Sequence, residues 1–501
     1  MSEVTDAVFP PDRAQRTALV VEPTGETVTF AELEERSNRA AHFFREQGLR
    51  IGDTVALLLE NRIELLVLAF AAQRCGLYYA AVNTHLTPAE IDYIVDDCGA
   101  SLVVSSSRCH LAVTEREIRG FSVDPVETEG WHLLDLAPYP VDPVADQAEG
   151  DFLLYSSGTT GRPKGIERPL TGGEFGSYPD IPGKWLSGLL GLVPGDVYLT
   201  PAPLYHAAPL AWTMGALRQG ATAVVMERFD APLALELIER HRVTHSQWVP
   251  TMFVRMLKLD PEVRNRFDLT SHRVAVHAAA ACPIEVKRQM IDWWGPILFE
   301  FYSSTEGVGA TSIFSDDWLR KPGSVGRPLI GKIEILDDDH RPVDTGVVGT
   351  IWFSGGSNFR YHGDAAKTAE AHDAEGRATV GDLGWMDEDG YLYLADRRAD
   401  LIISGGVNVY PREIEDALIL HPDVLDVAVV GLPDEEMGHR VVAFVQPRPD
   451  ATVPVDSLPL ALTEFCTDSL AKFKIPREFR FVDELPRTPT GKLRKHELLP
   501  R

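Results

Sequence analysis

The feature of this sequence that most constrains its fold is a repeated alternation of strand-like and helix-like segments, which begins near residue 27. "TVTFAELEERSNRAAHFFREQG" ends a strand and continues as an amphipathic helix, with Thr29 and Glu32 spaced as a capping box and Gly48 at the predicted end. "TVALLL" predicts a buried strand, Ile63–Arg74 a helix, Thr87–Glu90 the start of another helix and "SLVVSS" a strand. This alternation predicts an α/β fold with a largely parallel sheet covered by helices.

The pattern changes between about residues 320 and 400. "GKIEILDDDHRPVDTGVVGTIWFSGG" and "DEDGYLYLADR" are short alternating segments separated by Asp- and Gly-rich turns, which predicts a small antiparallel β subdomain over about 320–397. The β–α pattern then returns, with a helix from Pro411, strands in "DVAVVGL" and "HRVVAFVQP", and a helix near 457–471. A chain of 501 residues is too long to fold around a single compact core, so two or three structural units, each with its own core, are expected.

Charge and cysteine content exclude several functional classes. The net charge of −26 argues against nucleic acid or an anionic membrane as the main partner. The five cysteines form no CxxC pair, which suits a reducing, cytoplasmic location rather than a disulfide framework or zinc site. No leader peptide is evident at the N-terminus, and charged residues interrupt the apolar segment "VALLLENRIELLVLAFAA", so no membrane span is expected.

The segment "YSSGTTGRPKG", residues 155–165, has the composition of a phosphate-binding loop. Its glycines allow backbone N–H groups to approach phosphate oxygens, its hydroxyl side chains add donors, and Lys164 adds a positive charge. The segment lacks the Gly-Lys-Ser/Thr ending of a Walker A loop, so an ordinary P-loop is excluded. Taken alone, a glycine-rich surface turn remains an alternative.

Further motifs, which follow in a fixed order along the chain, indicate the family to which this loop belongs. "YSSGTTGRPKG" resembles the phosphate-binding signature of the adenylate-forming superfamily, which includes acyl-CoA synthetases, adenylation domains of peptide synthetases and luciferases. The resemblance extends over nearly the whole chain through "PLYH" (203–206), "YSSTE" (302–306), "VGD" (380–382), "DRRAD" (396–400), "SGGVNVYP" (404–411) and "PTGK" (489–492). The sequence is therefore identified as a member of this superfamily, in a branch similar to the fatty-acid and bulky alicyclic-acid ligases.

The resemblance implies both an activity and an architecture. A carboxylate attacks the α-phosphate of Mg·ATP to give acyl-AMP and pyrophosphate, and coenzyme A then displaces AMP, so the implied cofactors are ATP, Mg²⁺ and CoA. The implied fold is a large N-terminal domain, residues 1–397, of two helix-covered, mostly parallel sheets with the antiparallel β subdomain. A hinge at 398–400 joins it to a small mobile α+β domain at 401–501.

The resemblance also implies roles for individual residues. The phosphates are expected to contact the residues Ser156, Ser157, Gly158, Thr159, Thr160, Gly161 and Lys164. Tyr302 is expected to stack on adenine, with Ser303 and Thr305 beside it, while Asp382 and Arg397 hold the ribose. Glu306, with Thr159, is the expected Mg²⁺ site. His206 and Thr160 are expected at the reacting groups. For Asp382 or Arg397 taken singly, a structural ion pair is the alternative reading.

The predicted C-terminal domain contributes the remaining groups. Lys492 is expected to stabilise the charge that gathers on the α-phosphate during attack, and to arrive and leave with its domain. Eight basic residues against three acidic ones between residues 472 and 495 suit a polyphosphate ligand, or equally a solvated face. Gly405 and Gly406 are expected to line the pantetheine tunnel. Ala399 stands where the family places its hinge residue, and "HAAAACP" (277–283) has alanines in place of the family's glycines.

Alternative activities share these motifs. An acyl-AMP ligase that delivers to a carrier protein is the main alternative for the function, and a catalytically silent nucleotide-binding scaffold is a further one. The expected partners are a small carboxylic acid, ATP and CoA, and the chain is expected to be a monomer or homodimer. The motifs do not identify the acid, because acyl preference depends on pocket shape.

Overall fold

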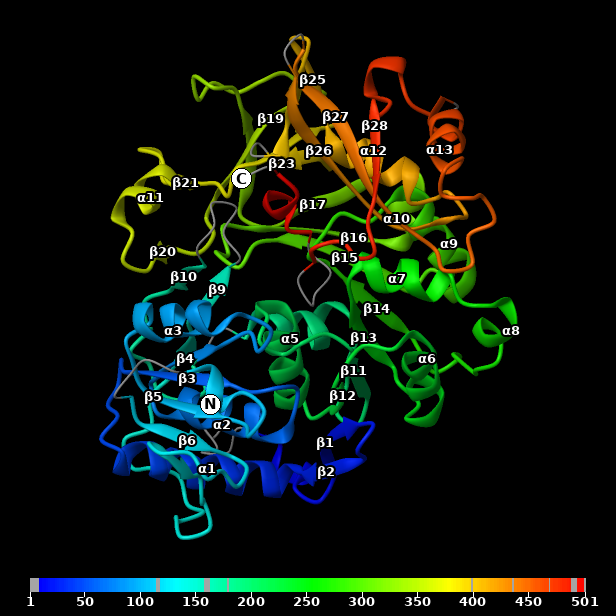
Figure 1. Cartoon of the computed structure of the whole chain (residues 1–501). Helices are drawn as coiled ribbons and strands as arrows, with labels where there is room; N and C mark the ends of the chain where they lie inside the picture. The colour runs from blue at the N-terminus through cyan, green and yellow to red at the C-terminus, as the bar shows by residue number, and fades with distance from the viewer. Residues whose placement is uncertain are drawn as a thin grey trace.

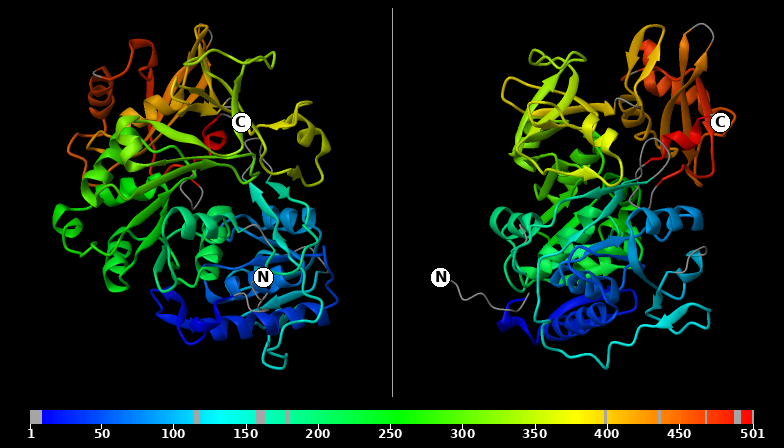
Figure 2. Two further views of the ribbon diagram at one scale, coloured as in Figure 1. Left: turned by 180° about the vertical axis from the view of Figure 1, so that it is seen from behind. Right: turned by 90° about the vertical axis from the view of Figure 1, so that its left-hand side faces the viewer.

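The computed structural model describes residues 9–113, 118–156, 163–177, 180–397, 400–434, 437–467, 469–487 and 493–499, with the backbone alone for Ser156 and Arg397. The first two-thirds of the chain, blue to green, form two helix-covered sheets, and the yellow-green strands extend the second of these (Figure 1). The orange and red C-terminal segment stands beside the yellow-green strands in the side view (Figure 2).

The first sheet is parallel throughout and has the strand order β7-β6-β5-β3-β4-β8. Its strands are β3 (Thr54–Leu58), β4 (Tyr78–Ala81), β5 (Ala100–Ser105), β6 (Gly120–Ser122), β7 (Trp131–Leu133) and β8 (Asp151–Phe152), and its helices are α1 (Phe30–Glu46), α2 (Ile63–Arg74) and α3 (Pro88–Asp97). Both predicted capping boxes are confirmed: the hydroxyls of Thr29 and Thr87 accept from the backbone N–H groups of Glu32 and Glu90.

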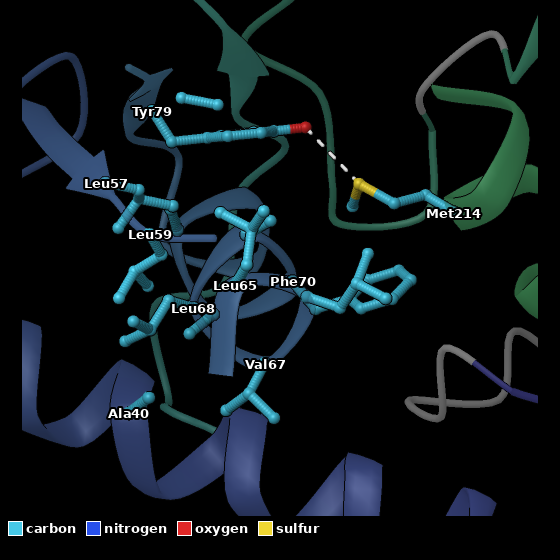
Figure 3. Packing of buried hydrophobic residues seen from close by; sticks show 14 of the residues in the cluster. Ala40, Leu57, Leu59, Leu65, Val67, Leu68, Phe70, Tyr79 and Met214 are labelled. Carbon is cyan, nitrogen blue, oxygen red and sulfur yellow. Dashed lines mark hydrogen bonds between the residues drawn. The ribbon is translucent and has the colours of Figure 1, made fainter. Parts of the chain in front are cut away.

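The core beside this sheet explains the long apolar segment near residue 60. Strand β3 and helix α2 come from that segment, and α2 is apolar on all sides because nearly all of its residues are buried. Figure 3 shows this packing, in which the Tyr79 hydroxyl lies 3.7 Å from the sulfur of Met214. Among the described helices, none combines the length and the apolar character that crossing a bilayer requires.

The second sheet has a parallel centre with strand order β1-β12-β11-β13-β14-β15. Its strands are β1 (Thr17–Glu22), β11 (Val197–Thr200), β12 (Thr222–Met226), β13 (His245–Trp248), β14 (Val274–His277) and β15 (Leu298–Ser303), with β2 (Glu26–Thr29) antiparallel at one edge. Its helices are α4 (Ile181–Lys184), a π-helical turn Trp185–Leu189, α5 (Ala207–Arg218), α6 (Ala231–Arg240), α7 (Pro250–Leu257), α8 (Pro261–Arg264) and α9 (Ile284–Trp294).

Helix α5 joins the two sheets into one domain. Its residues Leu210, Met214 and Leu217 belong to the core of the first sheet, whereas Trp212 and Ala216 pack in the core of the second. A helix buried from both sides must be apolar around its whole circumference, as this one is. The side of the second sheet that α5 covers therefore faces the interior of the large domain.

Antiparallel strands continue the second sheet beyond β15, where the sequence predicts the β subdomain. They are β16 (Ala310–Phe314), β17 (Ser324–Ile330), β18 (Lys332–Leu336), β19 (Gly349–Ser354), β21 (Arg377–Ala378), β22 (Asp382–Met386) and β23 (Leu392–Arg397), with helices α10 (Ser315–Arg320) and α11 (Ala365–Glu370). A separate small sheet contains β9 (Leu154–Ser156), β10 (Lys164–Glu167) and β20 (Arg360–Tyr361), and so brings the loop-bearing hairpin to the β subdomain.

The residues after 400 form a second unit with its own core, termed here the C-terminal domain. It contains the hairpin β24 (Ile402–Ser404) and β25 (Val407–Val409), the sheet β26 (Val424–Asp434), β27 (Gly438–Pro447) and β28 (Glu478–Phe481), and helices α12 (Pro411–Leu418) and α13 (Leu458–Thr467). Its buried residues form clusters separate from those of the large domain. The predicted fold class, two helix-covered mostly parallel sheets with an antiparallel extension and a small α+β domain, is confirmed.

Candidate active site

A cavity of about 2730 Å³ lies between the large domain and the C-terminal domain. The carboxyl ends of several parallel strands open onto it, which is where α/β proteins commonly bind ligands. Residues of the C-terminal domain, among them Arg412 and Lys495, border it from the other side. Of the residues predicted for the site, the cavity is lined by Lys164, His206, Tyr302, Ser303, Thr305, Glu306 and Asp382.

The hairpin that carries the predicted phosphate loop is formed by β9 and β10, in which Lys164 pairs with Ser156. Residues Ser157, Gly158, Thr159, Thr160 and Gly161 lie outside the described residues, so their predicted contacts stay predictions. Lys164 lines the cavity, and its Nζ lies 5.9 Å from the centre of the Tyr361 ring. The hairpin therefore delivers one cation of the predicted loop to the cavity wall.

The segment 302–306 brings the aromatic ring of Tyr302 and the carboxylate of Glu306 to the same wall, and β22 adds the carboxylate of Asp382. The Tyr302 hydroxyl, at the end of β15, donates a 2.7 Å hydrogen bond to Asp382 Oδ2 at the start of β22. Ser303 Oγ donates to the Gly309 carbonyl at 2.8 Å and so stabilises the turn that follows. Tyr302 and Asp382, remote in sequence, thus form one surface for a planar ring and a hydroxylated sugar.

Glu306 is a buried carboxylate at this wall, with 8 % of its surface exposed. The Tyr361 hydroxyl donates to Glu306 Oε1 at 3.0 Å, and the same tyrosine ring lies below Lys164. A carboxylate fixed near a predicted phosphate loop is suited to hold Mg²⁺ against phosphate oxygens. The sequence analysis did not predict that Tyr361 orients Glu306. In the sequence, Tyr361 is simply an aromatic residue in a stretch without a regular pattern.

Arg397 and Asp382 are direct neighbours across the antiparallel pair β22–β23. The side chain of Arg397 is outside the described part of the structure, so its predicted contact with the ribose stays a prediction. Its backbone position places it next to the carboxylate with which it was expected to act.

The acyl side of the cavity is apolar and aromatic. His206 is the N-cap residue of α5 and its ring centre lies 4.6 Å from that of Tyr205. Farther along, the Trp212 ring stacks on Phe301 at 5.3 Å, and Trp185 meets both rings edge-on at 6.1 and 5.9 Å. Such walls favour an acid with an apolar body, and aromatic faces suit a ring.

The alanine run 278–281 also lines the cavity, next to these aromatic residues. Ala279 has a φ of +75°, a left-handed conformation that favours glycine. Where the resemblance leads one to expect glycine, Ala279 therefore adds a methyl group to the lining of the cavity.

The wall that contains Tyr302, Glu306 and Asp382, termed here the nucleotide wall for its predicted role, has a buried charged pair below it that the sequence analysis did not predict. Lys287 of α9 is fully buried and its Nζ lies 2.5 Å from Glu300 Oε2, two residues before Tyr302. His277 Nε2 lies 3.8 Å from the same oxygen, and burial, together with the charge of Lys287, holds the pKa of His277 well below its usual range. The histidine is therefore neutral, and Lys287 is the charge partner of Glu300.

The C-terminal domain contacts the large domain through polar groups. Lys258, at the end of α7, donates to the carbonyls of Val424 and Leu425 at 2.6 and 3.2 Å. Arg412 donates through its backbone N–H to Asp396 Oδ2 and through its guanidinium to the Leu394 carbonyl. Burial and the charge of Arg448 lower the pKa of Lys258 to about 8, against the opposing effect of Asp426.

The segment with Lys492 approaches the cavity from the C-terminal domain. Lys492 itself lies outside the described residues, but Arg487 and Leu493 on either side form an antiparallel bridge and line the cavity. The neighbouring Lys495 pairs with Glu415 at 2.9 Å. Arg487 and Leu493, which flank the residues outside the described part of the chain, thus lie at the cavity in this domain orientation.

Gly405 and Gly406 form the turn of the β24–β25 hairpin, with φ values of +56° and +76°. A Cβ atom at Gly405 would lie 2.4 Å from Met437 Cε, whereas one at Gly406 would meet nothing within 4 Å. Neither glycine is among the described residues that line the cavity in this orientation. Their predicted contact with CoA requires the C-terminal domain to rotate.

Comparison with known proteins places the chain in a family. Residues 9–361 match the family described as "AMP-binding enzyme", and residues 413–492 match "AMP-binding enzyme C-terminal domain". The chain is 30 % identical over 486 residues to a 2-succinylbenzoate–CoA ligase of Bacillus subtilis, with 97 % of this chain and 95 % of that protein covered. It is 31 % identical to a long-chain-fatty-acid–CoA ligase of Mycobacterium tuberculosis, with 95 % and 93 % covered.

A solved structure agrees with these relatives. The crystal structure of an anthranilate CoA ligase in complex with anthranoyl-AMP matches with a TM-score of 0.83 at 27 % identity, covering 97 % of this chain and 94 % of that one. The chain belongs to the AMP-binding enzyme family. The predicted class, an AMP-forming acid–thiol ligase of the adenylate-forming superfamily, is confirmed.

Proposed function

We propose that the protein activates a fatty or bulky ring-bearing carboxylic acid with ATP and transfers the acyl group to coenzyme A. The observation that carries this proposal is one continuous cavity that joins a nucleotide wall, with Tyr302, Asp382 and Glu306, to an apolar aromatic pocket beside His206. An enzyme that joins an acid to a nucleotide needs both surfaces in contact, and a simple nucleotide-binding protein needs only the first.

In the first half-reaction, a carboxylate oxygen of the acid attacks the α-phosphate and pyrophosphate leaves. Tyr302 stacks on the adenine, Asp382 accepts hydrogen bonds from the ribose hydroxyls with Arg397 beside it, and Lys164 and the loop 156–161 hold the β and γ phosphates. Glu306 and Thr159 would hold Mg²⁺, which would supply positive charge that balances the negative charge of the phosphates. His206 orients the incoming carboxylate, and Thr160 and Lys492 stabilise the charge that develops at the reacting phosphate.

In the second half-reaction, the thiol of CoA attacks the acyl carbonyl and AMP leaves. Support for a domain rotation between the two steps comes from the different placement of two C-terminal segments: the neighbours of Lys492 border the cavity, whereas Gly405 and Gly406 do not. Rotation of the C-terminal domain about the residues near 398–400 would move the Lys492 segment away from the cavity and bring Gly405 and Gly406 to it.

The test is pyrophosphate release from ATP with a panel of acids that vary in chain length and ring type, first without and then with CoA. We expect release with a subset of apolar acids and, once CoA is added, a thioester and AMP in equal amounts by mass spectrometry. Absence of release with every acid would favour a silent scaffold. Acyl transfer to a carrier-protein phosphopantetheine but not to CoA would favour the carrier-protein ligase.

The compartment and the assembly state are also proposals. All five cysteines are free and all except Cys109 are buried, which suits a reducing compartment such as the cytoplasm. A monomer or a homodimer is expected, and light scattering during size-exclusion chromatography distinguishes the two.

A further inference from the structure

The wall of the acyl pocket contains one polar side chain among apolar ones. Gln247 of β13 lines the cavity and is itself buried, with 4 % of its surface exposed. In the parallel register, Gln247 pairs with Val276 of β14, and Val276 with Phe299 of β15. Paired residues point to the same face of a sheet, and so do residues two apart on a strand, so Gln247 shares its face with the pocket residue Phe301.

The orientation of the Gln247 amide is set by a tyrosine behind it. Tyr198 of β11 is fully buried, and its hydroxyl lies 3.4 Å from Gln247 Oε1. A buried hydroxyl must donate its proton to an acceptor, and Gln247 Oε1 is the acceptor that the described residues provide. Burial raises the pKa of Tyr198 well above its usual range, so the hydroxyl keeps this proton. The amide oxygen therefore faces Tyr198, and the amide nitrogen is left for the cavity.

Among the described residues, the hydrogen bond from Tyr198 is the contact found for the Gln247 amide, and its nitrogen donates to none of them. The residues that the sheet register places on its face, Val276, Phe299 and Phe301, have side chains without a hydrogen-bond acceptor. A hydrogen-bond donor left unpaired in an apolar pocket is unfavourable, so its partner has to come from what enters the pocket.

Resting on the proposed function, we infer that Gln247 selects acids that carry a hydrogen-bond acceptor, such as a keto oxygen, on the acyl body away from the reacting carboxylate. The carboxylate itself belongs beside His206, at the start of α5, whereas Gln247 lies on the sheet below that helix. The substrate class is thus an apolar acid with an oxygen function on its chain or ring, and not a plain hydrocarbon acid.

The test compares matched acids of equal length that carry a methylene, a carbonyl or a hydroxyl at successive positions from the third carbon onward. We measure kcat/KM for pyrophosphate release with wild-type protein and with Gln247→Leu, a change that removes the amide and keeps the volume. Wild-type protein should prefer the best oxo acid to its methylene analogue by about tenfold to a hundredfold. In Gln247→Leu the ratio should fall to within about threefold, and the midpoint of thermal unfolding, compared with that of wild-type protein, is the control for folding.

The inference would be overturned if Gln247→Leu kept the wild-type ratio of kcat/KM for the oxo acid to kcat/KM for its methylene analogue. It would also be overturned if wild-type protein preferred none of the oxygenated acids. Absence of release with all acids would instead contradict the proposed function and would leave no acyl preference to explain.

Tyr198→Phe tests the orientation separately. This change frees the amide to turn its oxygen toward the cavity, where it can accept a hydrogen bond from the substrate. The ratio of kcat/KM for hydroxy acids to kcat/KM for oxo acids should therefore rise by at least about threefold. An unchanged ratio of oxo to hydroxy acid would show that Tyr198 does not set the direction of the amide.

Discussion

The nucleotide wall and the domain boundary each contain a lysine that is shielded from water, but the two lysines have different hydrogen-bond partners. Lys287, below the nucleotide wall, is fully buried and pairs with the carboxylate of Glu300 inside one core. Lys258, at the domain boundary, has two backbone carbonyls of the other domain as its hydrogen-bond acceptors. A charge paired within a core is expensive to separate, whereas a contact with two carbonyls can be exchanged for water.

This difference shows which parts of the site are fixed. The nucleotide wall is built on β15 and α9 around the buried Lys287–Glu300 pair, so we expect it to stay rigid during the reaction. The domain boundary is held by hydrogen bonds such as those of Lys258 and Arg412, which suit a contact made and broken in each cycle.

Replacing Lys287 by Met should lower the free energy of unfolding by about 3–5 kcal/mol, because it leaves the Glu300 carboxylate buried without its charge partner. Chemical denaturation of the whole protein measures this, with Lys332→Met on the exposed strand β18 as the control. A loss below about 1 kcal/mol for Lys287→Met would mean that the nucleotide wall is not fixed by this pair.

Replacing Lys492 by Ala should slow acyl-AMP formation by about a hundredfold to a thousandfold, the usual effect of removing one group that stabilises developing charge. Thioester formation from supplied acyl-AMP should stay within about threefold, since the lysine has by then left the site. Lys472→Ala, an exposed lysine of the same domain, is the control. Equal losses in both half-reactions would contradict the alternation of domains.

Replacing Gly406 by Leu should slow thioester formation by about tenfold or more, through steric crowding of the pantetheine arm, and spare pyrophosphate release. The matched control is Gly376→Leu, because Gly376 has a φ of +77° and open space around its Cβ position, as Gly406 does with +76°. Both variants carry the same backbone strain. Unaltered kinetics with CoA in Gly406→Leu would remove this turn from the CoA path.

Replacing Lys258 by Met should destabilise the present domain orientation by about 1–2 kcal/mol, through the loss of its two hydrogen bonds. Acyl-AMP formation should slow by roughly fivefold to thirtyfold, with thioester formation from supplied acyl-AMP unchanged. Lys258→Arg, which keeps a charged donor, should recover most of the rate. If the Met variant formed acyl-AMP at the wild-type rate, the contact would have no part in domain placement.

The same lysine predicts a smaller dependence on pH. Its pKa is lowered to about 8 in this orientation, and a lysine exposed by rotation titrates near about 10.4. This orientation binds fewer protons between those values, so it gains stability as the pH rises from 8 toward 10 and shows no such change below pH 8. The ratio of wild-type to Lys258→Met rates of acyl-AMP formation should therefore rise severalfold between pH 7.5 and 9.5. A flat ratio would show that Lys258 stays charged.

Local pattern and ordered motifs were enough to predict much of this structure. The capping boxes at Thr29 and Thr87 define helix starts through contacts three residues apart, so sequence spacing alone identifies them. The helix expected near 457–471 is present as Leu458–Thr467, so its start was predicted to within one residue and its end was placed four residues too late. The family could be predicted from seven motifs, because their residues and their order can be read from the sequence without knowledge of any tertiary contact.

The contacts that were missed depend on register and on domain orientation. Lys287 meets Glu300 because α9 lies against β15, and Gln247 meets Tyr198 because β13 pairs with β11. Neither pairing has a short-range signature. The distance of Gly406 from the cavity depends on how the C-terminal domain is turned, which the motif around it does not encode.

The left-handed alanine at residue 279 has a consequence for natural variation in this protein. Holding a non-glycine residue at a φ of +75° costs about 1–2 kcal/mol, and Ala279→Gly would release that strain while widening the pocket by one methyl group. A single nucleotide change can convert an alanine codon to a glycine codon. One substitution would therefore raise the stability of the chain and at the same time enlarge the pocket, so at this position stability and the size of the pocket change in linked ways.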